Sequence, residues 1–124
     1  MYIHTIESRD DYKRIYVDGI KTRYFINRTG NVLGYKYKQL RTHICRQGYE
    51  RITLRVNKKT RNQKIHRLVA IAHIPNPTNE EQVNHMNGNK LDNNYTNLEW
   101  CNGSYNILHS QGKYKTFQEY LALH

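Results

Sequence analysis

The sequence predicts an α+β fold in which a small N-terminal antiparallel β-sheet is followed by a helix and then by a strand, loop, strand and helix unit. Three stretches carry this prediction. Residues 51–56 alternate apolar and polar side chains, which is the period of a half-buried strand. Residues 66–73 place apolar side chains at helical spacing and are followed by two prolines. Residues 83–108 hold two short alternating runs separated by an Asn- and Gly-rich loop.

Positive charge is concentrated in the first half of the chain. The 124 residues fit one domain and carry a net charge of +10. Residues 1–67 hold 17 of the 20 Lys and Arg with five acids, whereas residues 68–124 hold three bases and five acids. We therefore expect the first half to bind a polyanion, with a basic solvated face as the alternative. Apolar runs are too short for a membrane span or a signal peptide, so we expect neither.

The basic half reads as short strands separated by turn residues. Candidate strands are residues 24–26, 32–33, 35–44 and 51–56, and residues 57–62 form a turn from which residues 63–65 return. Ile15, Val17 and Ile20 are the candidate buried residues before these strands. We expect a single antiparallel sheet of three or four short strands.

The strand at residues 51–56 separates a core face from a charged face. Its apolar side chains fall on one side, whereas Arg51 and Arg55 fall on the other. A two-stranded ribbon can enter a DNA groove and present alternate side chains to it. The candidate nucleic-acid-binding residues are an outward basic set and one residue of the next helix: Lys36, Lys38, Arg41, Arg46, Arg51, Arg55, Lys58, Lys59, Arg61, Lys64 and Arg67.

The helix expected at residues 66–73 supports the unit that follows it. Leu68 and Val69 belong to its apolar face, and His66 and His73 lie near its ends, where a structural role is commoner than a metal-binding one. Beyond residue 110, Thr116 opens a capping box for a short final helix. The apolar side chains of that helix either pack on the core or meet another subunit.

Residues 83–108 concentrate the side chains that bind metals and transfer protons. Val83 and the pair Leu98 and Trp100 mark the two strands, and Asn102 is a good N-cap for the helix that follows. The stretch resembles the motif of the HNH endonucleases, whose fold is called the ββα-metal finger, and in particular the homing endonucleases of phages and introns. The resemblance rests on Asn84-His85, Asn97-Leu98-Glu99-Trp100 and Asn106, preceded by His66-Arg67-Leu68-Val69-Ala70 and Ile74-Pro75-Asn76-Pro77.

This resemblance implies a metal-dependent endonuclease that hydrolyses phosphodiester bonds of double-stranded DNA. It makes His85 the general base, since a neutral imidazole accepts a proton from water at physiological pH. Asn97 then ties the long loop so that the base is held in place. For the second ring nitrogen of His85 we expect a backbone carbonyl or an amide of the Asn-rich loop as partner.

The resemblance makes Asn84 and Asn106 the metal ligands. Their hard amide oxygens favour Mg²⁺, with Mn²⁺ as the alternative. Many relatives carry Asp where this chain has Asn84, so we expect the ion to bind weakly until DNA completes the site. Cys45 and Cys101 stand 56 positions apart without a C-x-x-C pair, and no structural zinc is expected.

Three regions of one compact domain follow: a basic β-rich DNA-binding region at residues 1–65, the HNH nuclease core at residues 66–110 and a short C-terminal helix at residues 111–124. The expected partner is double-stranded DNA. A monomer predicts nicking, whereas a homodimer permits a double-strand break. We expect a cytoplasmic protein, in the host cell for a phage-encoded chain. Two alternatives stay open: a catalytically weak or inactive DNA-binding protein with an HNH fold, and an HNH partner of phage DNA packaging.

Overall fold

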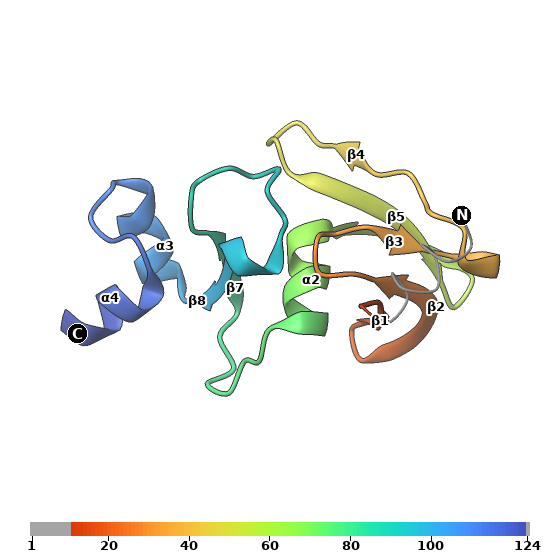
Figure 1. Ribbon diagram of the computed structural model, residues 1–124, viewed down its shortest axis with the longest axis horizontal. Coiled ribbons are helices and arrows are strands. Elements are labelled where there is room, and N and C mark those ends of the chain that lie inside the picture. Colours follow the sequence, from red (N-terminus) through yellow and green to blue (C-terminus); the bar gives the residue numbers. More distant parts are fainter. Residues whose placement is uncertain (1–10, 124) are drawn as a thin grey trace.

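Helix α2 (Ile65–His73) lies between two N-terminal sheets and a C-terminal hairpin in the computed structural model, which describes residues 11–123 (Figure 1). The helix predicted from apolar spacing is thus confirmed. Its Ile65, Leu68 and Val69 side chains are buried in the main core. Strands of all three sheets contact it. The apolar face of α2 is therefore the centre of the hydrophobic core.

The first sheet has the order β1, β2, β3 and is antiparallel. Its strands are β1 (Lys13–Val17), β2 (Ile20–Ile26) and β3 (Val32–Leu33). Ile15 and Val17 are buried as predicted, and Ile20 is half-buried. The region predicted to bind DNA starts at residue 1, and its first ten residues lie outside the described residues.

The second sheet has the order β4, β5, β6 and is also antiparallel. Its strands are β4 (His43–Ile44), β5 (Glu50–Val56) and β6 (Lys59–Lys64). The prediction of one N-terminal sheet is therefore wrong, because the strands before α2 form two sheets. The turn between β5 and β6 is also shorter than predicted, because Asn57 and Lys58 alone adopt the left-handed conformation, with φ of 50° and 66°, that a two-residue hairpin turn requires.

Residues 35–44 do not form the predicted strand. A 3-10 turn, η1 (Tyr35–Tyr37), interrupts the run, with Lys36 at φ 56°, and only two residues of the run pair in β4. Side chains 35–39 are all exposed. The alternating Tyr and Lys imitate the period of a strand, but no apolar face is available to fix the segment on the core.

The C-terminal part forms the predicted strand, loop, strand and helix. Strands β7 (Gln82–His85) and β8 (Leu98–Cys101) pair antiparallel, and α3 (Gly103–Ser110) follows. A 3-10 turn, η2 (Tyr95–Asn97), leads into β8. Asn102 caps α3 as predicted, because its Oδ1 accepts a hydrogen bond from the Tyr105 N–H at 2.8 Å. The α+β fold class is confirmed.

Helix α4 (Phe117–Leu123) packs beside α3 through a small separate core. Cys101, Tyr105 and Phe117 are buried there. Thr116 caps the helix, since its hydroxyl accepts from the Glu119 N–H at 3.2 Å. Leu121 and Leu123 remain exposed, so only the first turn is packed. None of the helices within residues 11–123 has the length and apolar character that crossing a membrane requires.

Gly30 allows the turn between β2 and β3 to lie against α2. It has a φ of +96°, and a Cβ at this position would lie 2.8 Å from Cγ2 of buried Ile65. We expect Gly30→Ala to lower the free energy of unfolding by about 1–3 kcal/mol, because strain and overpacking add. Urea denaturation gives this value.

Gly112→Ala is the matched control for that measurement. Gly112 has a φ of +76° and nothing within 4 Å of a Cβ, so this variant reports the backbone strain alone. Equal losses in the two variants would contradict the close approach of the turn to α2.

Candidate active site

A cavity of about 700 Å³ brings together three of the side chains singled out in the sequence. Asn84 and His85 come from the end of β7, and Asn106 comes from the first turns of α3. Tyr49, Lys90 and His109 also line the cavity. Strand, helix and loop residues that are far apart in the sequence therefore face one space, as the resemblance implied.

The ring of His85 is held by a buried amide. His85 is 5% exposed, and its Nε2 lies 2.8 Å from Oδ1 of Asn93. Asn93 in turn donates through Nδ2 to Oε1 of Glu50 at 2.8 Å. Because an amide oxygen only accepts, the His85 Nε2 carries the proton and Nδ1 keeps the lone pair. The expected loop amide is confirmed as the partner of His85.

Asn93 and Glu50 were missed in the sequence. Asn93 is one of several loop asparagines, and Glu50 counts there only as one of the few acids in the basic half. Thr42 donates to the other oxygen of Glu50, Oε2, at 2.5 Å. The carboxylate at the start of β5 thus fixes an amide of the Asn-rich loop 43 positions later. The one signal in the sequence that could have indicated Glu50 was its position as an acid among many basic residues.

Two buried histidines and a tyrosine pack against one another beside the cavity. The ring centroids of His66 and His85 are 4.6 Å apart, and those of His66 and Tyr49 are 5.2 Å apart. Burial, followed by the charge that His85 carries when protonated and by the charges of Lys64 and Arg67, lowers the pKa of His66 to about 3. Burial also lowers the pKa of His85, and the hydrogen bond to Asn93 opposes this. Both imidazoles are therefore neutral at physiological pH.

Asn84 and Asn106 are both oriented by bonds through their amide nitrogens. Nδ2 of Asn84 donates to Oε2 of Glu99 at 3.0 Å, and Nδ2 of Asn106 donates to Oε1 of Gln82 at 2.5 Å. With the nitrogens engaged, each side chain offers its Oδ1 as the acceptor. Two neutral hard oxygens on one cavity fit Mg²⁺ or Mn²⁺ that keeps water and phosphate ligands. Among residues 11–123, no cluster of three His, Cys, Asp or Glu side chains could hold a metal.

Asn97 ties the loop that joins β7 to β8. Its Oδ1 accepts from the Asn87 N–H at 3.1 Å, and its Nδ2 donates to Oδ1 of Asn87 and to the Asp92 carbonyl. The side-chain to backbone bonds expected of Asn97 are thus present. Asn97 supports the loop, whereas Asn93 makes the direct bond to His85. His73, by contrast, bonds the Ile26 carbonyl at 3.0 Å and lies outside the cavity lining.

The register of β5 and β6 divides the outward basic set between two faces. Directly opposite side chains in an antiparallel pair point to the same side. Lys64 is opposite Arg51, so both share a face with Arg55, whereas Lys59 and Arg61 are opposite the core residues at positions 56 and 54. The expectation of one outward face is wrong. Side chains alternate between the two sides along β6, so Lys59 and Arg61 cannot share a side with Lys64. Arg61 instead pairs with a carboxylate of the β1–β2 turn, at 3.5 Å.

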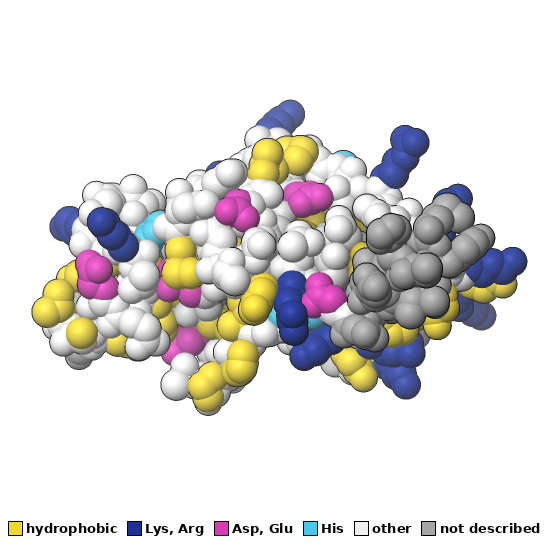
Figure 2. All heavy atoms as spheres, viewed as in Figure 1, with side chains coloured by type: hydrophobic (Ala, Val, Ile, Leu, Met, Phe, Trp, Pro, Cys, Tyr) yellow, Lys and Arg dark blue, Asp and Glu magenta, His cyan; other side chains and the backbone are white. Residues whose placement is uncertain are grey.

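The other predicted basic residues lie outside the strands of this sheet. Lys36, Lys38, Arg41 and Arg46 lie in η1 and the loops flanking β4, Lys58 lies in the β5–β6 turn, and Arg67 lies on α2. Arg67 donates to the Glu81 carbonyl at 2.8 Å. Figure 2 shows Lys and Arg mainly over the part that holds β1 to β6, with acids mainly in the middle and toward the C-terminal helices.

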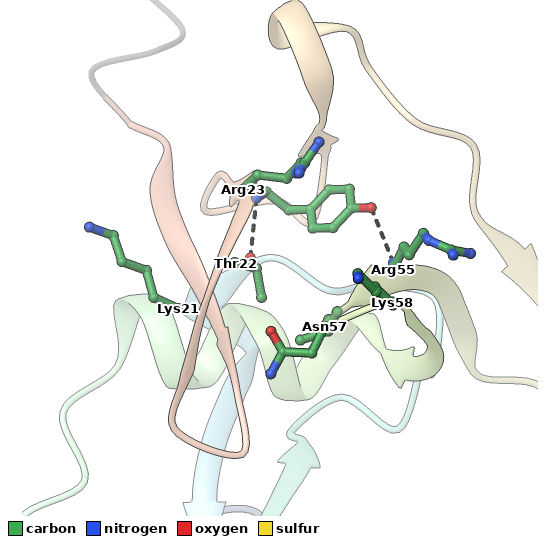
Figure 3. Close-up of a pocket in the computed structure, with 8 residues that line it drawn as sticks. Lys21, Thr22, Arg23, Arg55, Asn57 and Lys58 are labelled. Atoms are coloured by element: carbon green, nitrogen blue, oxygen red, sulfur yellow. Dashed lines mark hydrogen bonds between the residues drawn. The ribbon is translucent and has the colours of Figure 1, made fainter.

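A second hollow, of about 400 Å³, separates β2 from the β5–β6 turn (Figure 3). Lys21, Arg23, Arg55 and Lys58 line it. In Figure 3 the charged ends of Lys21 and Arg55 point in opposite directions, so the cations are spread along the groove and do not converge on one point. The sequence pattern before residue 24 was too weak to reveal Lys21 and Arg23. Lys90 at the first cavity was missed as well, because it lies outside the basic half.

Comparisons with known proteins agree with these features. A family model described as HNH endonuclease matches residues 63–107. The Uncharacterized HNH endonuclease L245 of Acanthamoeba polyphaga mimivirus is 40% identical over 87 residues, which are 69% of this chain and 26% of that protein. The DNA endonuclease I-HmuI of Bacillus phage SP01 is 35% identical over 92 residues, which are 73% of this chain and 53% of that protein.

A solved structure described as DNA binding and cleavage by the HNH homing endonuclease I-HmuI is also similar. The two structures align with a TM-score of 0.69 at 34% identity. The alignment covers 83% of this chain and 60% of the solved chain. The chain thus spans about a quarter of the mimivirus protein and just over half of the phage enzyme.

The low pKa of His66 makes stability depend on pH. The unfolded chain binds a proton at this histidine below its ordinary pKa of about 6.5, whereas the folded protein does so only near pH 3. Stability is therefore complete above pH 6.5 and is lost as the pH falls from there toward 3. Between pH 7 and pH 5 we expect His66 to remove about 1–2 kcal/mol from the free energy of unfolding.

Urea denaturation of the wild type and of His66→Gln at both pH values checks this expectation. The pH-dependent loss should be smaller in His66→Gln by that amount, whatever its stability at pH 7. His43→Gln, at an exposed position of β4, is the matched control and should behave as the wild type. A pH-dependent loss that is equal in all three proteins would contradict the buried neutral state of His66.

Proposed function

The chain belongs, through residues 63–107, to the HNH endonuclease family, and we propose that it is a divalent-metal-dependent endonuclease of double-stranded DNA. It would hydrolyse a phosphodiester bond and leave a 5′ phosphate and a 3′ hydroxyl. One observation carries this proposal: a neutral histidine with a fixed tautomer, His85, shares a cavity with the two asparagines Asn84 and Asn106.

In the proposed reaction His85 accepts the proton of the attacking water. Its Nε2–H is engaged with Asn93, so Nδ1 is the basic atom. The lowered pKa keeps the imidazole unprotonated at physiological pH, which a general base needs. Asn97 contributes by keeping the loop that carries Asn93 in place. Asn93 is thus a positioning residue for His85.

Asn84 and Asn106 would hold the divalent ion through their Oδ1 atoms, most suitably Mg²⁺. When bound, such an ion neutralises the charge that develops on the phosphate in the transition state. Because both protein ligands are neutral, the DNA phosphate supplies the first negative ligand. The metal site is therefore expected to form fully only on the substrate.

We further propose that the basic region before residue 65 binds the DNA. Arg51, Arg55 and Lys64 share the outer face of the second sheet, and the groove of Figure 3 continues the positive charge onto Lys21 and Arg23. Spread cations suit the repeated phosphates of a duplex better than a single anion. The HNH core would then act on the DNA strand that this region presents.

A second candidate function is DNA binding without efficient cutting. Asn84 supports it, because a neutral amide binds a divalent ion more weakly than the Asp of many relatives does. The two candidates differ in whether metal and His85 produce any turnover.

Cleavage of supercoiled plasmid tests the proposed function. With Mg²⁺ or Mn²⁺ we expect open-circle product, and His85→Ala should lower the rate by about 10²–10⁴-fold because the general base is lost. Early linear product would indicate paired active sites. Lys113→Ala, between α3 and α4 and outside both the cavity lining and the basic region, is the control and should cut normally.

An EDTA control must abolish cutting. If the wild type binds DNA but cuts none of several phage and host DNAs, the binding function replaces the nuclease. Turnover that survives both EDTA and His85→Ala would reject the assigned chemistry.

The salt dependence of DNA binding tests the basic face. If the sheet neutralises about six phosphates, affinity should fall about a thousandfold between 50 and 200 mM salt. Arg55→Gln should flatten the slope of log K against log salt by about one. Lys113→Gln, between α3 and α4, should leave the slope unchanged. Fluorescence anisotropy in EDTA measures both, and equal slopes for Arg55→Gln and the wild type would remove Arg55 from the interface.

A further inference from the structure

Glu99 holds the side chain that we assign as the first metal ligand. The register of β7 and β8 sets Glu99 directly opposite Asn84, and Nδ2 of Asn84 donates to Oε2 of Glu99 at 3.0 Å. A bond from an amide to a carboxylate is charge-assisted, and it fixes which end of the amide points away from Glu99. The Oδ1 of Asn84 is thereby directed as the acceptor.

The carboxylate of Glu99 is itself fixed from two further directions. The Tyr105 hydroxyl of α3 donates to Oε2 at 2.5 Å, and the Phe117 N–H at the start of α4 donates to Oε1 at 2.8 Å. Three donors from three elements therefore hold Glu99 in one place. This is the arrangement expected of a group whose position matters to its neighbour.

Among residues 11–123, no cation forms an ion pair with Glu99. The two ion pairs found within residues 11–123 involve Asp11 and Asp18, not Glu99. All three donors to Glu99 are neutral. A full negative charge thus lies one hydrogen bond from Asn84, in a site whose two assigned ligands are uncharged.

We propose that Glu99 is a positioning residue of the metal site, which directs Oδ1 of Asn84 toward the cavity and supplies the negative charge that Asn84 lacks. A carboxylate that accepts from the amide nitrogen polarises the amide and makes its oxygen a stronger donor to a cation. The pair Glu99 and Asn84 thereby replaces a single Asp ligand. This inference rests on the proposed function, because it takes Asn84 as a metal ligand.

Binding of Mn²⁺ to the full chain on DNA tests this role without relying on turnover. Electron paramagnetic resonance of free Mn²⁺ gives the affinity. All variants are made in the His85→Ala protein, so that the DNA stays uncut during the measurement. Glu99→Gln keeps the length of the side chain but removes the charge, and it should weaken Mn²⁺ binding by about 10- to 100-fold. Glu119→Gln, which removes one negative charge at an exposed position of α4 outside the cavity lining, is the matched control and should stay within about threefold.

Glu99→Asp separates the role of the charge from that of packing. It keeps the charge and shortens the side chain, so it should bind Mn²⁺ more tightly than Glu99→Gln. A purely structural Glu99 predicts the opposite order, since Gln preserves the shape. Unchanged Mn²⁺ affinity in Glu99→Gln, or a larger loss in Glu99→Asp, would overturn the proposal. If Glu99→Gln does not fold, Glu99→Asp decides: a loss within about threefold supports the proposal, and a loss of tenfold or more overturns it.

Adding Glu99→Gln to the Asn84→Asp variant provides a second, independent test of the charge role. There the ligand carries its own charge and lies opposite another carboxylate, so removing the charge of Glu99 should no longer weaken Mn²⁺ binding. A tenfold loss on adding Glu99→Gln to Asn84→Asp would contradict the charge role. If the parent on DNA binds no Mn²⁺, the metal site fails and this inference with it. Normal Mn²⁺ binding with an indifferent Glu99 overturns this inference alone.

Discussion

Burial of one short helix is the constraint on which the rest of the structure depends. The apolar face of α2 is shared by both N-terminal sheets and by the β7–β8 hairpin, so no sheet completes its core without it. A chain of this size has enough apolar area for one modest core, and placing a helix at its centre lets three small sheets use the same buried surface. The helix also places His66 against His85, which joins the core to the cavity.

The cavity uses the same orienting device twice. An asparagine donates through Nδ2 to a carboxylate from another strand, and its Oδ1 is then directed at a functional group or at the cavity. Asn93 and Glu50 do this for His85, and Asn84 and Glu99 do it within the β7–β8 pair. Amides would otherwise be free to turn over, and a nearby carboxylate favours one orientation. Two acids in a basic protein thereby fix the site.

The sequence revealed the elements whose signals are local. The alternation in β5, the apolar spacing in α2 and the cap at Asn102 each lie within a few residues, and each was predicted. Pairing between distant segments was not accessible in this way. Glu50 meets Asn93 only after β5 and the loop have packed, and no local pattern marks that contact.

Other differences have equally physical causes. Lys59 and Arg61 were predicted to lie in a six-residue turn. The turn has only two residues, so both belong to β6, where they are opposite core residues of β5. The run at 35–44 lacked an apolar face to hold it as a strand. Asn84, His85 and Asn106 were found because the spacing of a known motif encodes contacts that composition does not. Their catalytic and metal-binding roles remain proposals.

Strand β6 ends at Lys64 and α2 begins at Ile65, so no linker separates the basic sheet from the segment that leads to the cavity. Ile65 is fully buried at this junction, and the two parts cannot swing independently. If the sheet binds a duplex as proposed, the fold fixes the number of base pairs between the bound site and the cleaved bond. Such a protein would shift its cutting position by changes in this joint, not by changes in the reacting groups.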